Sequence, residues 1–277
     1  MTLAEIEAHL RAAPISSSEP APEVTSALAA LKANAVVRND QVVAKRLWCL
    51  ETVQEIQGHF LRAFSLFREG KFYDGWCLLE KAEIALSWLA PHLEEHDNEF
   101  QMERIAMLVA RYQKLFPYSW FFSPEIIELA KECTICGKVV RIRHPCGHRV
   151  GEIYDGVMCA RRVTDFKFMG GAVVQSPVQK YSVLFLNDPE TKETKDHYDY
   201  SRVAYIVGLV ESALELWDVT ISQVRKPLSD FGKIGRNAPC PCRSKKKFKA
   251  CCLPEGGILS NHYQFSIHRG PGLVLAA

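Results

Sequence analysis

The sequence predicts an α+β protein that is mainly α-helical, and three observations support this fold class. Apolar residues recur at helical spacing through most of the first 130 residues. Short β-type runs and one further helical stretch follow, up to about residue 227. Eight of the ten cysteines lie in this second part or just after it, in two tight groups. We therefore expect an N-terminal helical bundle, a central cysteine-containing element with short strands and a long helix, and a small C-terminal cysteine knob.

The N-terminal bundle is expected to begin with a short helix, in which Leu3, Ile6 and Leu10 share one face. Residues 14–22 are rich in serine and proline, which predicts a linker. An alanine-rich stretch over residues 24–37 predicts the next helix, because alanine has the highest helix propensity.

The clearest helix extends from about Asp40 to Arg68, because apolar residues form one continuous face along it. Gly70 is expected to end this helix, since glycine readily takes the positive φ of a helix C-cap. Further helices are predicted over 72–89 and 98–116. The links between these helices are short, so the helices are expected to pack as an antiparallel bundle.

The central part mixes predicted strands with one long helix. Residues 181–186 predict a strand, and the polar residues 187–195 predict an exposed loop. A long helix is predicted from about 203 to 224, with Pro227 marking its end. Residues 228–234 then form a linker.

These elements divide the chain into four expected parts. They are a helical domain (1–130), an α+β domain (131–227), the C-terminal knob (233–253) and a tail with strand character (254–277).

The cysteine spacing indicates metal binding rather than disulfide bonds. The N-terminus is acidic and lacks the basic region of a secretory signal, and the longest apolar run is far shorter than the ~20 residues of a membrane helix. We therefore expect a cytoplasmic chain with no membrane span. In a reducing compartment, C-x-x-C and C-x-C spacings favour a metal, and sites of four thiolates, or of three thiolates and an imidazole, select zinc. Two zinc sites are expected.

The C-terminal cysteine group is Cys240, Cys242, Cys251 and Cys252, four thiols within thirteen residues. A segment of this length cannot bury a core alone, but one zinc ion held by all four thiols would organise it. Two prolines beside the first pair stiffen its turn, which lowers the entropy lost on metal binding.

Residues 235–252 resemble the SEC-C motif, a zinc-binding module found at the C-terminus of the SecA translocation ATPase and on many other bacterial proteins. The family usually has glycine where Arg243 and Lys245 stand, so we expect the turn after Cys242 to differ slightly. All four zinc ligands of the motif are present. The matching residues are Gly235, Arg236, Asn237, Pro239, Cys240, Pro241, Cys242, Ser244, Lys246, Lys247, Phe248, Lys249, Cys251 and Cys252.

This resemblance implies a zinc-held knob that binds a protein partner, such as an export chaperone, or the ribosome. From Lys233 to Cys252 there are seven basic side chains and no acidic one, which favours an acidic protein surface or phosphates as the partner. The candidate partner-binding residues are Arg236, Arg243, Lys245, Lys246, Lys247 and Lys249.

The central cysteine group lies within residues 133–159. Its first pair belongs to the sequence Cys-Thr-Ile-Cys-Gly, which is typical of a zinc knuckle whose glycine lets the backbone fold back under the metal. The candidate ligands are Cys133, Cys136, Cys159 and, for the fourth place, either Cys146 or His148. We expect a structural site in a zinc-ribbon or treble-clef-like element, because a catalytic zinc needs an open coordination position.

Charge is unevenly distributed along the chain. Residues 1–130 hold 12 basic and 18 acidic side chains, whereas residues 131–277 hold 22 basic and 14 acidic ones. The basic second half favours an anionic partner, unless the two halves neutralise each other within one fold. Nucleic-acid binding is therefore an alternative function, supported by the arginines around the central group: Arg141, Arg143, Arg149, Arg161 and Arg162.

One pattern raises the question of catalysis. Residues 92–96 read His-Leu-Glu-Glu-His and match H-x-x-E-H, an inverted zinc-peptidase pattern, although the flanking residues favour an exposed polar connector. The chain contains no phosphate-binding G-x-x-x-x-G-K-[ST] and no G-x-S-x-G motif. We therefore expect a non-enzymatic zinc-binding adaptor. The alternatives are a zinc-dependent nucleic-acid-binding protein and a hydrolase or toxin-like effector of bacterial defence that uses His92, Glu95 and His96.

Overall fold

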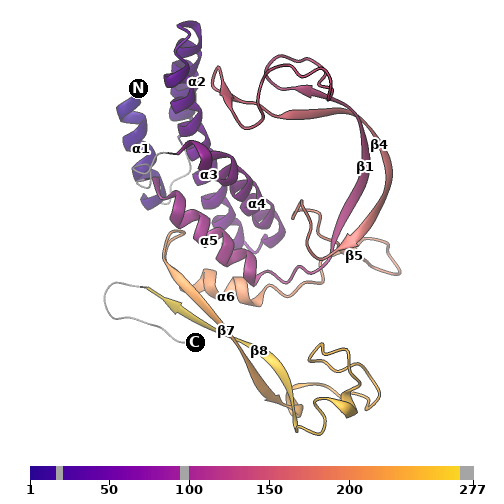
Figure 1. Cartoon of the computed structure of the whole chain (residues 1–277). Helices are drawn as coiled ribbons and strands as arrows, with labels where there is room; N and C mark the ends of the chain where they lie inside the picture. The colour runs from indigo at the N-terminus through magenta and orange to yellow at the C-terminus, as the bar shows by residue number, and fades with distance from the viewer. Residues whose placement is uncertain (17–20, 94–99, 269–277) are drawn as a thin grey trace. The chain divides into compact units, whose positions relative to one another are not determined.

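The computed structural model describes residues 1–16, 21–93 and 100–268, which form a mixed α and β fold (Figure 1). This part of the chain contains six α-helices and four two-stranded antiparallel sheets. It divides into two compact units, Met1–Leu214 and Glu215–Ala277. The finer division expected from the sequence, into parts ending at 130, 227 and 253, stays a prediction.

The first unit begins with a bundle built around one long helix. Asp40 caps the N-terminus of this helix, and its carboxylate accepts a hydrogen bond of 3.1 Å from the backbone N–H of Val43. Gly70 follows the C-terminus with φ +77°, the conformation expected for a glycine C-cap. The bundle helices are α1 (Leu3–Ser16), α2 (Pro22–Val37), α3 (Gln41–Arg68), α4 (Phe72–Leu89) and α5 (Met102–Leu115), with a 3-10 turn η1 (Ala90–His92).

The core of the bundle is apolar, with one buried amide that joins three segments. Phe60, Phe67 and Tyr112 pack ring against ring between α3 and α5. The fully buried Gln57 of α3 donates hydrogen bonds to the carbonyl of Leu10 at 2.9 Å and to that of Phe100 at 3.1 Å. This amide therefore fixes α1 and the segment before α5 on the long helix.

The helical prediction for the first 130 residues fails at its end, because β1 (Phe121–Cys133) is a strand. It pairs antiparallel with β4 (Arg161–Val174) along its whole length, with three irregularities of register. The β-branched Ile126 and Ile127 favour this conformation, but the ladder also depends on a partner strand far along the chain. We call these two strands the ribbon.

The lower end of the ribbon in Figure 1 is anchored on the bundle by the segment after β4. The indole N–H of Trp76 donates to the carbonyl of Lys180 at 2.7 Å, and the hydroxyl of Tyr73 donates to that of Tyr181 at 2.7 Å. Of the predicted strand over 181–186, only Val183, which forms a single bridge with Phe121, and Leu186, which begins the next strand, are in β structure. That strand, β5 (Leu186–Asn187), and β6 (Thr194–Lys195) enclose the expected exposed loop.

The predicted long helix over 203–224 is wrong. Helix α6 (Ser201–Leu209) ends early, and Trp217–Pro227 forms strand β7 instead. Residues 210–216 hold buried apolar side chains in an irregular segment, which imitates helical spacing in the sequence. Val219 and Ile221 are β-branched and favour the strand, and the tail supplies its pairing partner.

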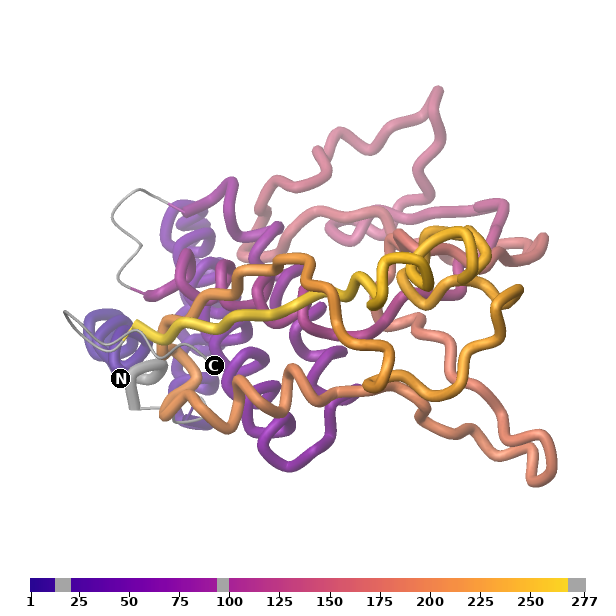
Figure 2. The backbone as a smooth tube through the Cα atoms, turned by 90° about the horizontal axis from the view of Figure 1, so that it is seen from below, coloured from indigo at the N-terminus to yellow at the C-terminus, as the bar shows by residue number. Residues whose placement is uncertain are grey.

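The second unit is one long hairpin with an insertion. Strand β7 pairs with β8 (Gly257–Ile267) from Trp217↔Ile267 to Pro227↔Gly257, so residues 257–267 of the tail form a strand paired with β7. The two strands lie side by side in both views of the chain (Figures 1 and 2). Residues 228–256 connect the two strands along the chain, and they include the 3-10 turns η3 (Leu228–Asp230) and η4 (Phe248–Ala250). The knob is therefore inserted in a hairpin rather than attached to a linker.

Candidate metal centres

The structure brings the four C-terminal cysteines together at the spacing of a zinc site. All four sulfur atoms lie within 4.8 Å of one another. Neighbouring sulfurs are 3.3 Å apart for Cys240 and Cys242, 3.5 Å for Cys242 and Cys251, and 3.9 Å for Cys251 and Cys252. Tetrahedral zinc holds each sulfur at ~2.3 Å and spaces the sulfurs about 3.8 Å apart, so this donor set fits the metal.

Backbone hydrogen bonds hold the two cysteine turns against each other. The N–H of Cys240 donates to the carbonyl of Lys246 at 2.8 Å, and that of Arg243 donates to Cys240 at 3.0 Å. Arg243 and Lys245 both adopt φ +62°. The turn after Cys242 therefore has the left-handed conformation that glycine supports, with larger side chains in it.

A small apolar core fixes this cysteine cluster to the hairpin. Phe248 is 3% exposed and packs with Cys240, Cys252 and Ile258, the second residue of β8. Partly buried residues complete this core: Leu228, Phe231, Ile234, Cys242, Cys251 and Leu253. The segment 228–234, expected to be a linker, is thus part of the packed knob.

Hydrogen bonds favour the thiolate form that a metal requires. The hydroxyl and then the N–H of Ser244, together with Cys240, lower the pKa of Cys242 to about 6. Zinc binds cysteine as thiolate, so a lowered pKa reduces the cost of releasing the proton on binding.

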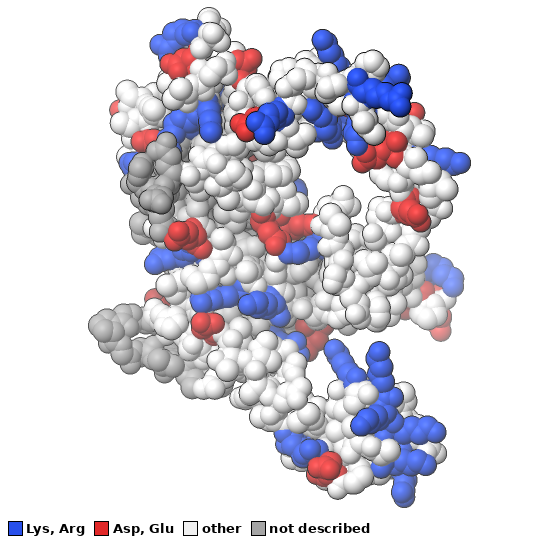
Figure 3. All heavy atoms as spheres, viewed as in Figure 1, with Lys and Arg blue, Asp and Glu red and all other residues white. Residues whose placement is uncertain are grey.

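The six candidate partner-binding residues of the knob are all exposed. They flank the four cysteines in the sequence, and Figure 3 shows Lys and Arg side chains, in blue, gathered at the knob. Next to them lies a pocket of about 410 Å³ lined by Leu228, Phe231, Ile234 and Phe248, among other residues. The knob therefore presents a basic surface beside an apolar pocket.

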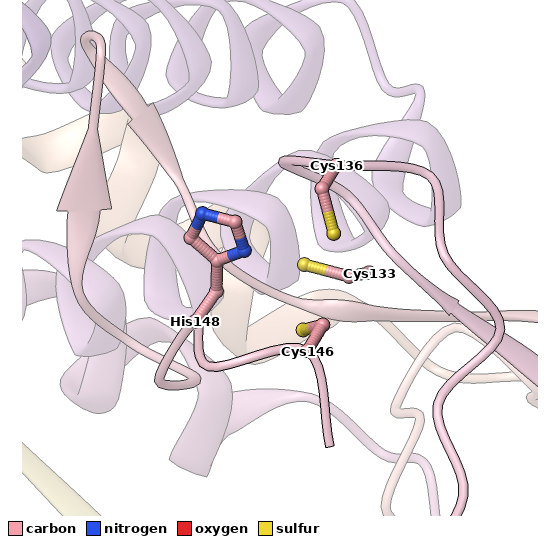
Figure 4. A group of neighbouring side chains, drawn as sticks. All are labelled: Cys133, Cys136, Cys146 and His148. Atoms are coloured by element: carbon pink, nitrogen blue, oxygen red, sulfur yellow. The ribbon is translucent and has the colours of Figure 1, made fainter. Parts of the chain in front are cut away.

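The central cluster collects its donors from distant positions. Ligand atoms of Cys133, Cys136, Cys146 and His148 lie within 4.8 Å of one another. In Figure 4 one ring nitrogen of His148 faces the three sulfur atoms. Cys133 comes from the end of β1, and the other residues come from the turn and loop that follow. Both Cys146 and His148 therefore lie at the site, although the sequence offered them as alternatives.

A turn of the zinc-knuckle type supports the first pair of cysteines. Gly137 has φ +68°, its N–H donates to the carbonyl of Cys133 at 2.9 Å, and the N–H of Cys133 donates to Lys138 at 3.0 Å. Burial raises the pKa of Cys133, but hydrogen bonds from the N–H groups of Cys136 and Ile135 lower it to about 6. The backbone fold is thus arranged to hold a thiolate at Cys133.

His148 has an unsatisfied buried nitrogen. No described residue bonds to its Nδ1, which is buried, while its ring edge packs against Tyr154 at 4.8 Å between centroids. A buried polar atom without a partner is costly, and a metal ion would satisfy it. The donor set of three thiolates and one imidazole fits zinc.

Cys159 is a fifth donor beside these four. It follows β3 (Val157–Met158), which pairs with β2 (Ile153–Tyr154), and its Sγ lies 3.9 Å from that of Cys133. Arg161 donates to this sulfur at 3.3 Å and, through its other nitrogen, to the carbonyl of His148 at 2.7 Å. The sequence ranked Cys159 among the first-choice ligands, whereas the four-donor group that the structure assembles does not include it.

The central cluster is docked on the bundle through its loop. Gln41 of α3 donates to the carboxylate of Asp155 at 2.5 Å and accepts from the N–H of Asp155 at 3.0 Å. Nε2 of His92 lies 2.9 Å from the carbonyl oxygen of Gly151. His92 therefore contacts the loop of the cysteine cluster. The other members of the H-x-x-E-H pattern, Glu95 and His96, lie outside the described residues, so a third metal site there stays a prediction.

The arginines near this cluster fall into two groups. Arg161 donates a hydrogen bond to the sulfur of Cys159, and a guanidinium nitrogen of Arg162 lies 3.6 Å from a carboxylate oxygen of Glu132. The side chains of Arg141, Arg143 and Arg149 are exposed.

None of the described helices is both long and apolar enough to cross a lipid bilayer.

The comparisons with known proteins concern only the C-terminal cluster. A 25-residue match to the protein translocase subunit SecA 1 of Rhodopirellula baltica is 64% identical and covers 9% of this chain and 2% of that protein. A 30-residue match to the uncharacterized protein YecA of Escherichia coli is 60% identical and covers 11% of this chain and 14% of that protein. The chain thus spans only a small fraction of these relatives, and no solved structure matches it significantly. The SEC-C motif model matches residues 236–254, so this chain contains a SEC-C motif, as the resemblance of residues 235–252 indicated.

Proposed function

We propose that this chain is a cytoplasmic zinc-binding adaptor whose knob docks on an acidic surface of a protein partner. Both cysteine clusters would hold structural zinc, the central one as a zinc-ribbon or treble-clef-like element. The metal ions would supply no chemistry beyond fixing the backbone. The chain's own residues would do the recognition, through basic side chains on a rigid base.

One observation supports this proposal most directly. The knob exposes seven basic residues, and no acidic residue occurs from Lys233 to Cys252. The metal and the Phe248 core would fix the backbone that holds these side chains. Such a surface attracts acidic partners over distances of about one Debye length, ~8 Å at physiological salt.

The hairpin dictates how the knob should be removed. Cutting the chain at residue 233 would also delete β8 and leave β7 without its partner. A cleaner variant replaces residues 228–256 by Asn-Gly, which favours a two-residue hairpin turn between Pro227 and Gly257. We expect this variant to keep its strand pairing, lose one zinc per chain and lose binding to a polyglutamate peptide.

A charge reversal tests the surface without removing it. Changing Lys245, Lys246 and Lys247 to glutamate should weaken polyglutamate binding more than tenfold, while zinc content stays the same. The matched control changes Lys167, Lys192 and Lys195, three exposed lysines of the first unit, and should leave binding unchanged. Equal loss in both variants would show that net charge, and not the knob, binds the peptide.

Zinc stoichiometry tests the metal sites themselves. Elemental mass spectrometry of the purified chain should give about two zinc ions per chain, one for each assembled cluster. A ratio near one would exclude one cluster as a zinc site. A ratio near three would bring the His92, Glu95 and His96 pattern back as a metal site and reopen the enzyme alternative.

Nucleic-acid binding is a second candidate, favoured by the exposed arginines of the central loop. Replacing Arg141, Arg143 and Arg149 by serine would then weaken binding to an RNA oligonucleotide and reduce the salt dependence of its affinity, since each phosphate contact releases counterions. The wild-type chain would have to bind that RNA at low salt. Absence of such binding would eliminate this candidate.

A further inference from the structure

The ribbon has one apolar face that no described helix of the first unit covers. Cross-strand partners share a face, and the ladder pairs Phe122 with Val173, Ile126 with Phe168 and Glu128 with Phe166. Alternation along β1 places Phe122, Ile126 and Glu128 on the same side. We call Phe122, Ile126, Phe166, Phe168 and Val173 the apolar face; all five are between 40% and 59% exposed.

The geometry of the face shows that its apolar side chains are organised. A Cβ added to Gly171 would lie only 2.3 Å from ring atoms of Phe122, so the phenylalanine ring lies directly over this glycine. Glycine in a strand commonly leaves room for such a ring from the neighbouring strand. The opposite side of the same stretch carries Glu125, Lys167 and Asp165 beside the exposed Ile127, so it is the more polar of the two sides.

The helices of the first unit leave the middle of the ribbon uncovered. No described helix packs along β1 or β4. The space-filling view shows open space between the ribbon and the helices (Figure 3). An isolated two-stranded hairpin is marginally stable in water and needs another layer over its apolar face. Exposed apolar patches of several hundred Å² usually mark an interaction site.

We propose that this face binds the same face of a second copy of the chain. The exposed parts of its five side chains amount to roughly 500 Å², so two copies would bury about 1,000 Å², the area at which a biological interface becomes plausible. Two stacked ribbons ~10 Å apart would form a small sandwich with the phenylalanines inside.

The distribution of side chains on the face suits two-fold symmetry. The pair Ile126 and Phe168 lies in the middle part of the face, with Phe122 and Val173 towards one end and Phe166 towards the other. A two-fold axis near Ile126 would set the Phe122 end of one copy on the Phe166 end of its partner, and the reverse. The one charged residue among these ladder pairs is the acidic Glu128, beside Phe166, so the pairs offer an acidic peptide or a nucleic acid no cation to bind.

The test is the mass of the full-length, zinc-loaded chain in solution, measured by sedimentation velocity and light scattering over a range of concentrations. We expect a species of twice 31.3 kDa that dissociates on dilution. The double variant Phe166→Glu with Phe168→Glu should raise the dissociation constant about thirtyfold or more, the effect of removing a central contact. Lys167→Glu is the control, since it makes the same change of net charge on the opposite side of β4 and should leave the dimer intact.

A second variant guards against a folding defect in the first. Ile126→Lys would place two like charges at the axis and should also dissociate the dimer, while zinc content and circular dichroism stay as in the wild type. A wild-type chain that is monomeric at every concentration would overturn the proposal and leave the face to a different protein. Dimers that persist in both face variants, or that Lys167→Glu also dissociates, would equally overturn it.

Discussion

The two cysteine clusters reach similar geometry by different routes. The C-terminal cluster takes four donors from two turns within residues 240–252 and has its own small core around Phe248. The central cluster takes five neighbouring donors from residues 133–159, including the ends of β1 and β3, and contacts the bundle through Gln41 and His92. The first is a local module built mostly from one short segment, whereas the second depends on the long-range ladder that positions it.

Loss of metal should therefore have the largest effect and should differ between the clusters. Structural zinc contributes ~10–16 kcal/mol in small metal-folded modules. Replacing Cys240 and Cys252 by serine should remove one zinc and unfold the knob, with the first unit unchanged. Replacing Cys133 and Cys136 should remove the other zinc and also loosen the end of the ribbon and the loop near His92. Hydrogen exchange measured along the chain distinguishes the two patterns. A purely local effect in both variants would show that the central cluster is as independent as the knob.

The core of the knob offers the next largest effect. Phe248→Ala should destabilise the knob by about 3–5 kcal/mol, because it removes a fully packed ring beside Cys240, Cys252 and Ile258. The destabilisation would be measured as faster zinc transfer to a chelator and as loss of hydrogen-exchange protection over residues 238–253. Phe231→Ala, at the edge of the same core, is the milder comparison. An unchanged chelation rate for Phe248→Ala would mean that the metal alone holds the knob together.

The central cluster has five neighbouring donors for four coordination positions. The zinc affinities of variants of these donors can identify the one that is not a ligand. His148→Ala should lower the affinity of that site more than Cys159→Ser does, because His148 belongs to the assembled four-donor group. Removing a neighbour that only supports a ligand costs about 10–100-fold in affinity, which is the effect expected for Cys159. Competition with a zinc indicator measures both variants. The reverse order would make Cys159 a ligand and His148 its support.

Much of this fold could be predicted from local sequence. The errors of the prediction occur where residues distant in sequence determine the local structure. Helices α3 and α4 and the SEC-C cysteines were predicted because periodicity, the Gly70 cap and spacing are local signals. Strands β1 and β7 were missed because their partners are distant in sequence, and the apolar spacing before Trp217 imitated a helix. The donor set of the central cluster could not be chosen from sequence, because five donors fit four places until the loop conformation is known.

The smallest effect concerns the two left-handed residues of the knob. Arg243→Gly and Lys245→Gly should each stabilise the knob by about 1 kcal/mol, since a side chain at positive φ is strained and glycine is not. Lys246→Gly, at a position outside the left-handed region, should instead be neutral or destabilising. Thermal unfolding curves, recorded through the release of zinc, would rank the stabilities of the three variants. Stabilisation by all three variants would show that the effect comes from lost charge repulsion.

The insertion of the knob between β7 and β8 has a consequence for the order of folding. The first pair of this ladder, Pro227 with Gly257, encloses a loop of 29 residues. Closing such a loop costs about 3 kcal/mol of chain entropy, before any strand contact compensates for it. A zinc ion that has already joined Cys240 to Cys252 shortens the free part of that loop. The metal would thus act as the turn of the hairpin, and pairing of Trp217 with Ile267, at the far end of the ladder, would depend on zinc that neither residue touches.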